Sequence, residues 1–308
     1  MRFSFKSLKL KSILPPADLG WNRVRSACAN TDCHNTLLMR SVPGSRAGMN
    51  VGEAWFCSPD CFAVVSREKI AVLASGCVVE MPATPRLSLG LVLLAKGFLT
   101  EDQLRFATTA SKRRGTTLEE TLLEQGLATE KQLAAGRAIQ WGYPALSQDL
   151  AGQTVAADLP PSLLRACSAA PLHYSPKLRR LVLGFVHRVE HGLLQSIEQI
   201  TGCRAEACFI TPTEFADQMK RLRPMEGYDE VLIEKPGAIM QMARTLGGYA
   251  VELGATEAGF SKCKSWVWVR LLGKRGTADI IFSARDLAVA PSRSRAAALV
   301  PEVTGALG

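Results

Sequence analysis

The sequence lacks the two features that would place the chain in or across a membrane. No apolar run approaches the roughly 20 residues that a membrane-spanning helix needs. The first sixteen residues mix lysines with apolar side chains and contain no continuous hydrophobic stretch of the kind found in secretory signals. We therefore expect neither a transmembrane helix nor a cleaved signal. Residues 1–20 are predicted to be a flexible basic tail, with a membrane-surface helix as the alternative.

The sequence also lacks the motifs of nucleotide hydrolysis and of common catalytic sites. Its Gly273-Lys274 pair is not a phosphate loop, because that motif needs a glycine five residues before the second glycine and a hydroxyl residue after the lysine. Those two positions hold Trp268 and Arg275. No nucleophile paired with a base, no catalytic carboxylate pair and no open metal site is recognisable. The sequence thus predicts a protein that is not an enzyme and does not hydrolyse ATP.

Positive charge is in excess but is not concentrated in a block. The chain has 37 Lys and Arg against 28 Asp and Glu, a net charge of +9. A net positive charge favours phosphate partners, so a zinc-finger protein that binds nucleic acid is the alternative function. However, residues 21–75 lack the basic strip with interleaved aromatic residues that such binding usually shows. Nucleic acid is therefore not the preferred partner.

Cysteine, in contrast, is plentiful and patterned. Nine cysteines in a chain without a recognisable signal predict a reducing, cytoplasmic location, where metal binding is commoner than disulfides. Cys28 and Cys33 form a C-x4-C pair, and Cys57 and Cys61 form a C-x3-C pair. Two close thiolate pairs suit tetrahedral Zn²⁺, and four protein ligands leave no open position for a substrate. We predict one structural zinc ion on these residues; the alternative is four ordinary reduced cysteines.

The second cysteine pair lies at a predicted helix start. Ser58 is suited to cap a helix and Pro59 to occupy its first position, which brings both cysteines to the positive helix end. His34 directly follows Cys33 and is expected to be a bystander. The aromatic-Cys-Ser-x-x-Cys stretch resembles one half of small treble-clef fingers such as the MYND and TRASH modules. That resemblance implies a zinc-finger-like domain at residues 21–75.

One amphipathic pattern occurs twice, with an offset of 29 residues, and such repeats reveal architecture. The first copy comprises Leu89, Gly90, Leu93, Leu94, Gly97, Leu99, Leu104 and Ala107. The second copy comprises Leu118, Glu119, Leu122, Leu123, Gly126, Ala128, Leu133 and Gly136. Each copy predicts a helix that ends at a glycine, followed by a second helix capped by Thr100 or Thr129. Together they predict a bundle of about four short helices.

The tandem motif resembles the N-terminal domain of type II secretion and type IV pilus assembly ATPases, the MshE-type domain, over about residues 86–220. The resemblance implies a cytoplasmic bacterial protein and a cyclic di-GMP site, in which Leu and Gly make apolar contacts while Arg and Gln make polar ones. The matching positions of the candidate nucleotide site are Leu89, Gly90, Leu93, Leu94, Gly97, Leu104, Leu122, Gly126, Leu133 and Gln140, with Arg86 close by. No motif of the family's ATPase motor follows them.

The polar positions of the family motif are mostly replaced. Its arginine is Ser88 in the first copy and Thr117 in the second, and the terminal glutamine of the first copy is Ser111. Glu119 stands where the second copy should have glycine, which would bring a carboxylate to a phosphate. Only Gln140 matches, with Arg86, Arg113 and Arg114 as candidate substitutes. The sequence therefore predicts weak or absent binding of cyclic di-GMP.

After the repeat, the pattern predicts a small α/β subdomain up to residue 222. We expect helices at 162–168, 191–201 and 212–222 and strands at 172–174, 180–186 and 204–210. His187 and His191 are four residues apart, but no third ligand accompanies them, so a surface or capping role is preferred to a metal site.

Residues 223–286 predict a helix to about residue 252 and a hairpin of strands 264–272 and 277–282. Trp266 and Trp268 alternate with valines on the first of these strands. Packing of the tryptophans against the preceding helix is preferred to a binding face.

The predicted fold is α+β: a flexible basic tail (1–20), a zinc-finger-like domain (21–75), a linker (76–85), a secretion-ATPase N-terminal-type domain (86–222), a small α/β domain (223–286) and a disordered tail (287–308). The preferred function is a non-enzymatic, cytoplasmic regulatory or adaptor protein. Its expected partner is a protein, which the resemblance suggests belongs to secretion or pilus machinery.

Overall fold

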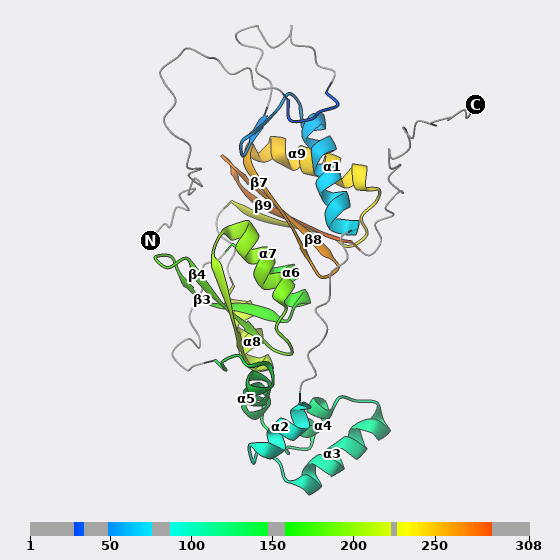
Figure 1. The fold of residues 1–308 in the computed structure, drawn as a ribbon, viewed down its shortest axis with the longest axis vertical. Helices are drawn as coiled ribbons and strands as arrows, with labels where there is room; N and C mark the ends of the chain where they lie inside the picture. Colours follow the sequence, from blue (N-terminus) through cyan, green and yellow to red (C-terminus); the bar gives the residue numbers. More distant parts are fainter. Residues whose placement is uncertain (1–27, 34–48, 76–86, 147–157, 223–226, 285–308) are drawn as a thin grey trace, which may run out of the picture.

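The structure, a computed structural model, describes residues 28–33, 49–75, 87–146, 158–222 and 227–284 (Figure 1). The predicted tails, the predicted linker and Arg86 lie outside these ranges. The fold is α+β, as predicted, with helices, three sheets and a cysteine cluster near the start of the chain. No helix within the described ranges is both long and apolar enough to cross a bilayer.

The tandem motif forms the predicted four helices, which occupy one end of the molecule (Figure 1). They are α2 (Leu89–Ala95), α3 (Glu101–Arg114), α4 (Leu118–Glu124) and α5 (Glu130–Trp141). Thr100 and Thr129 cap α3 and α5 through capping boxes with Gln103 and Gln132. The glycines that follow α2 and α4, Gly97 and Gly126, have φ angles of 68° and 62°, which explains why glycine recurs there.

The predicted α/β subdomain follows with every expected element in place. It contains α6 (Pro161–Ala166), β3 (Ala169–Ser175), β4 (Arg180–Phe185), α7 (His191–Thr201), β5 (Arg204–Phe209) and α8 (Pro212–Arg221). The strand order is β3-β4-β5, with β3 antiparallel and β5 parallel to β4. Helix α7 ends at Gly202 in the left-handed conformation, and Thr211 caps α8.

The C-terminal sheet has two strands more than the sequence analysis predicts. Its order is β6 (Tyr228–Ile233), β9 (Gly276–Ser283), β8 (Trp266–Gly273) and β7 (Ala255–Cys263), with α9 (Ile239–Leu253) between β6 and β7 in the chain. The predicted hairpin is β8 and β9. The added strands β6 and β7 form the two edges, where half-exposed positions give only a weak alternating pattern.

The cysteine-bearing segment 49–75 packs on this sheet instead of folding apart from it. Strands β1 (Met49–Val51) and β2 (Ala54–Phe56) form a hairpin that leads into α1 (Pro59–Ser75). Phe56, Phe62 and Ile70 of this segment share one hydrophobic core with Leu246 of α9 and Val269 of β8. Residues 49–75 and 228–284, which the sequence analysis divides between two domains, are thus joined by a common core.

The tryptophans of β8 face the α/β subdomain, so the expected packing against the preceding helix is wrong. Trp268 is fully buried with Leu193 and Ile197 of α7. The alternate residues Val267 and Val269 are the ones that pack with α9. Successive side chains of a strand point to opposite faces, and the two faces of this sheet are covered by different parts of the chain.

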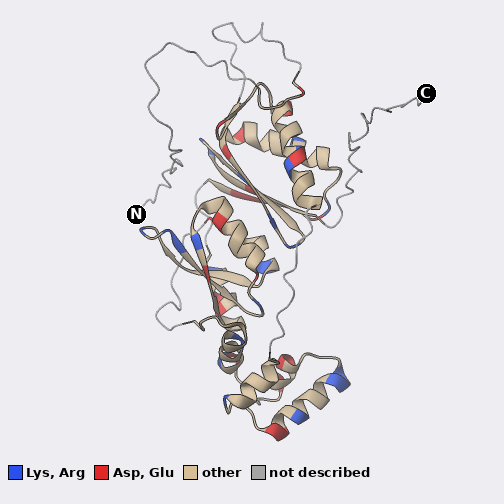
Figure 2. Cartoon of the chain, in the orientation of Figure 1, with Lys and Arg blue, Asp and Glu red and all other residues tan. Residues whose placement is uncertain are grey.

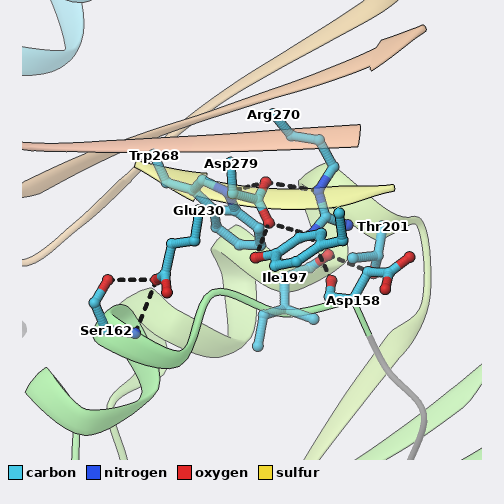
Figure 3. A network of polar contacts seen from close by, with 9 residues as sticks. Asp158, Ser162, Ile197, Thr201, Glu230, Trp268, Arg270 and Asp279 are labelled. Carbon is cyan, nitrogen blue, oxygen red and sulfur yellow. Dashed lines mark hydrogen bonds and ion pairs between the residues drawn. The ribbon is translucent and has the colours of Figure 1, made fainter. Parts of the chain in front are cut away.

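A buried ion-pair network lies on the tryptophan face (Figure 3). The Asp279 carboxylate is fully buried and accepts hydrogen bonds from Trp268 Nε1 at 2.7 Å, from Arg270 Nε at 2.8 Å and from the Tyr228 hydroxyl at 2.8 Å. Arg270 also donates to the Asp158 carbonyl, which links the sheet to the segment before α6. Arg270 Nη2 donates to the same carboxylate at 2.6 Å, so four hydrogen bonds from the chain satisfy Asp279.

The network keeps its charges despite burial. Burial by itself would lower the pKa of Arg270, but the hydrogen bonds and negative charge of Asp279 raise it above its ordinary value. Burial and the same carboxylate raise the pKa of Tyr228, so its hydroxyl remains a donor. The buried Arg270 charge therefore depends on the neighbouring Asp279 carboxylate.

We expect Asp279→Asn to lower the free energy of unfolding by about 3–5 kcal/mol, because it leaves the buried Arg270 charge uncompensated. Urea denaturation followed by circular dichroism measures the change. The control is Glu101→Gln, which removes the exposed Arg105 pair on α3 and should cost less than about 1 kcal/mol. Equal effects of the two substitutions would contradict a structural role for Asp279.

Candidate functional site

Four cysteine side chains converge between the 28–33 segment, β2 and the first turn of α1. The sulfur atoms of Cys28, Cys33, Cys57 and Cys61 all lie within 4.8 Å of one another. Cys57 Sγ is 3.4 Å from the sulfur of Cys33 and 3.4 Å from that of Cys61. A tetrahedron with metal–sulfur bonds of about 2.3 Å has edges of about 3.8 Å. The four sulfurs therefore fit the ligand set of one tetrahedral metal ion.

The first pair is positioned by a turn that is attached to β2. The Ala29 N–H donates to the Trp55 carbonyl at 2.8 Å. The Asn30 side-chain oxygen accepts from the Asp32 N–H at 3.1 Å, and the Asn30 carbonyl accepts from the Cys33 N–H at 3.1 Å. These bonds bend the chain so that both cysteines of the pair face the same point.

The second pair is held by the start of α1, as predicted. Ser58 Oγ accepts from the Cys61 N–H at 3.3 Å. The Asn30 side chain donates to Cys61 Sγ at 3.4 Å, a contact that the sequence analysis did not anticipate. Burial raises the pKa of the Cys61 thiol to about 12, and the Asn30 hydrogen bond opposes that shift. A metal cation at the centre of the cluster offsets the cost of burying a thiolate.

Among the residues that the structure describes, these cysteines form the one cluster of three or more potential metal ligands. His34 lies outside the described ranges. His187 and His191 belong to no such cluster, and His191 Nε2 lies 3.0 Å from the Tyr143 hydroxyl. The structure thus brings together the four predicted metal ligands and, within the described ranges, no second set.

The apolar residues of the candidate nucleotide site serve mainly as the core of the four-helix bundle. Leu89, Leu93, Leu122 and Leu133 are buried in one cluster, against which Leu104 packs. The Gly90 Cα lies close to Leu104, and an added Cβ would come within 2.7 Å of that side chain. Leu94 is half-buried, while Gly97 and Gly126 are exposed at the helix ends. The close apolar contacts of the motif are therefore present, but between helices.

Residues at the replaced polar positions have roles within the bundle. Ser88 and Thr117, which stand where the family motif has arginine, are the N-caps of α2 and α4. The Gln140 side chain donates to the Leu87 carbonyl at 2.6 Å. Arg114 pairs with Glu124 on the surface. Each of these groups is thus satisfied by the chain itself.

Glu119, at the position of the missing motif glycine, forms a partly buried ion pair. Its carboxylate accepts from Arg137 Nε at 3.2 Å, and Arg137 also donates to the Val186 carbonyl at the end of β4. The Arg137 side chain is 6% exposed. The sequence analysis did not predict that Glu119 and Arg137 link the helical bundle to the α/β subdomain. The one sequence feature that pointed to such a role is an arginine on the buried face of α5.

A cavity of about 250 Å³ lies beside this ion pair and has an acidic lining. Glu119, Glu120 and Glu130 line it together with Arg137 and His187. Burial, and then the Arg137 charge, lower the pKa of His187, so this side chain adds little positive charge at neutral pH. A net negative lining disfavours a dianionic ligand.

The fold resembles solved structures over less than half of the chain. No family model matches the chain, and no curated protein does. A structure of MshE with cdg is 24% identical, covers 45% of this chain and 100% of its own, and gives a TM-score of 0.37. One crystal form of the XpsE N-terminal domain is 18% identical, covers 45% of this chain and 99% of its own, and gives a TM-score of 0.34. A second crystal form is 19% identical, covers 46% of this chain and 100% of its own, and gives a TM-score of 0.28.

We expect Glu119→Ala to lower the free energy of unfolding by about 2–3 kcal/mol, because the largely buried Arg137 loses its counter-charge. Adding Arg137→Met should recover part of the loss, since no unpaired charge then remains. Thermal or urea unfolding measures both variants. The matched control is Glu124→Ala, which breaks the exposed pair with Arg114 and should change stability by no more than about 1 kcal/mol. An additive double variant would argue against the pairing.

Proposed function

We propose that the chain is a non-enzymatic, cytoplasmic adaptor in which a structural zinc site stabilises one end and the tandem helical module serves as a protein-docking scaffold. The observation that carries the proposal is the convergence of four cysteine sulfurs within 4.8 Å. Four protein ligands complete a tetrahedral site and leave no position at which a metal-bound water can react. Thiolate ligands favour zinc among the common divalent ions of proteins.

The zinc site is part of a unit larger than a free-standing zinc finger, because its segment shares a core with α9 and the C-terminal sheet. Phe56 and Phe62, next to Cys57 and Cys61, pack edge to face with ring centroids 5.3 Å apart inside the core shared with α9. Metal binding therefore stabilises the packing of α1 on the C-terminal sheet. Docking surfaces on that unit would depend on the metal in consequence.

The tandem module supports the scaffold role because its polar groups are used internally. The caps Ser88 and Thr117, the Glu119–Arg137 pair and the Gln140 amide stabilise the bundle. A cyclic dinucleotide carries two negative charges and needs charged or bidentate partners. We infer that the module is a degenerate relative of cyclic di-GMP-binding domains. Its protein partner in secretion or pilus machinery is proposed from the tandem motif alone.

We expect one Zn²⁺ per purified chain, measured by native mass spectrometry with elemental analysis. Cys57→Ser should release the metal and unfold residues 21–75, because metal binding of this type contributes on the order of 10 kcal/mol to folding. The control is Cys203→Ser, a buried cysteine away from the cluster, which should keep the metal. A folded chain that is free of metal would establish the alternative of ordinary reduced cysteines.

We expect cyclic di-GMP to bind weakly or not at all in isothermal titration. Each missing charge-assisted hydrogen bond costs about 1.5–3 kcal/mol, so two or three losses weaken binding by several orders of magnitude. The triple variant Ser88→Arg, Thr117→Arg and Glu119→Gly restores the family residues and should gain affinity for cyclic di-GMP. Submicromolar binding by the natural chain, abolished by Gln140→Ala or Arg86→Ala, would show instead that the site is intact.

A further inference from the structure

The turn between β3 and β4 presents an exposed aliphatic side chain among cations. Leu178 at this turn is 71% exposed, the highest value among the large apolar residues that the structure describes as exposed. Lys177, Arg179 and Arg180 flank it, and Arg204 lies opposite Arg180 on the neighbouring strand β5. Figure 2 shows Lys and Arg gathered at this end of the sheet. An isolated exposed leucine is ordinary, but one set among four cations is a distinct surface.

The turn is held in a costly conformation. Arg179 has a φ of 49°, in the left-handed region that non-glycine residues rarely adopt. Its carbonyl accepts from the Arg204 N–H at 2.7 Å, and its guanidinium donates to the Thr201 carbonyl at 3.4 Å. Strain of this kind persists where surrounding contacts impose it and is common at functional sites. The turn that exposes Leu178 is therefore held in place by the hydrogen bonds of Arg179.

The local charge is positive after its carboxylates are counted. Glu206 lies beside Arg180 and Arg204, and Glu198 accepts from the Ala205 N–H at 2.9 Å. Two carboxylates thus face four cations. Neither Lys177 nor Arg179 forms an ion pair with any carboxylate of the described part of the chain. Lys177, and the guanidinium N–H groups of Arg179 that do not bond to Thr201, can contact an anionic partner.

We propose that the hairpin tip, defined as residues 177–180 with Arg204, docks on an anionic phospholipid surface. Leu178 enters the boundary between head groups and acyl chains, while the cations lie at the level of the phosphates. A nucleic acid fits the tip less well, because single-stranded sites stack bases on aromatic side chains and the tip has none. One aliphatic residue and a few cations give reversible, peripheral attachment.

The test is flotation of the full chain with vesicles of phosphatidylcholine, with or without 30% phosphatidylserine. We expect binding to the anionic vesicles alone. Leu178→Ser should weaken it about tenfold through lost apolar burial. Lys177→Gln with Arg179→Asn should weaken it about 25-fold, at about fivefold for each cation; asparagine is chosen because it tolerates a positive φ.

Matched controls place the same changes elsewhere on the surface. Val72→Ser removes another aliphatic side chain, 69% exposed, and Lys112→Gln with Arg113→Gln removes two exposed cations of α3. Both should leave vesicle binding unchanged. Absence of binding, equal binding to neutral vesicles, or equal losses in the controls would overturn the proposal. Binding to an RNA or DNA oligonucleotide that the tip charges control and Leu178→Ser does not would overturn it in favour of nucleic acid.

Discussion

The rest of the structure depends on a single constraint: the C-terminal sheet β6-β9-β8-β7 carries large apolar side chains on both faces, and each face must be removed from water. On β8, Val267 and Val269 point to the side of α9 and α1, while Trp268 points to the α/β subdomain. Covering both faces recruits segments that lie on either side of the tandem motif in the chain. The sheet is therefore the point at which the cysteine-bearing segment 49–75 and the α/β subdomain meet (Figure 1).

Polar groups on one face make that meeting specific. Arg270 on β8 lies opposite Asp279 on β9, and the pair is buried where the α/β subdomain covers the sheet. A buried charge pair of this kind adds little net stability over apolar packing, but it strongly penalises any arrangement that separates the charges. Ser162 of α6 adds a second link, since its N–H donates to Glu230 of β6 at 2.8 Å. These polar contacts thus fix the position of the α/β subdomain on the C-terminal sheet.

A partly buried ion pair also links the tandem module to the α/β subdomain. Charged donors that bond within the fold are less available to a dinucleotide ligand. Here Arg137 is satisfied by Glu119 and by the Val186 carbonyl, which stabilises contact with the α/β subdomain. Stability and ligand recognition compete for the same side chains. An adaptor role agrees with that use, and the charged hairpin tip lies in a different part of the fold, on β3 and β4.

Local features of the sequence were sufficient to predict the helices of the repeat, the elements of the α/β subdomain and the convergence of four cysteines. These features depend on residues that are close in sequence, so a sequence pattern reveals them. Examples are the helix caps Thr100 and Ser58 and the left-handed Gly97. What only the tertiary structure decided are the edge strands β6 and β7, the face against which Trp268 packs, and the partner of Arg137. Each of these depends on residues far apart in sequence, because edge pairing, burial and ion pairing are satisfied by whichever distant segment the fold brings close.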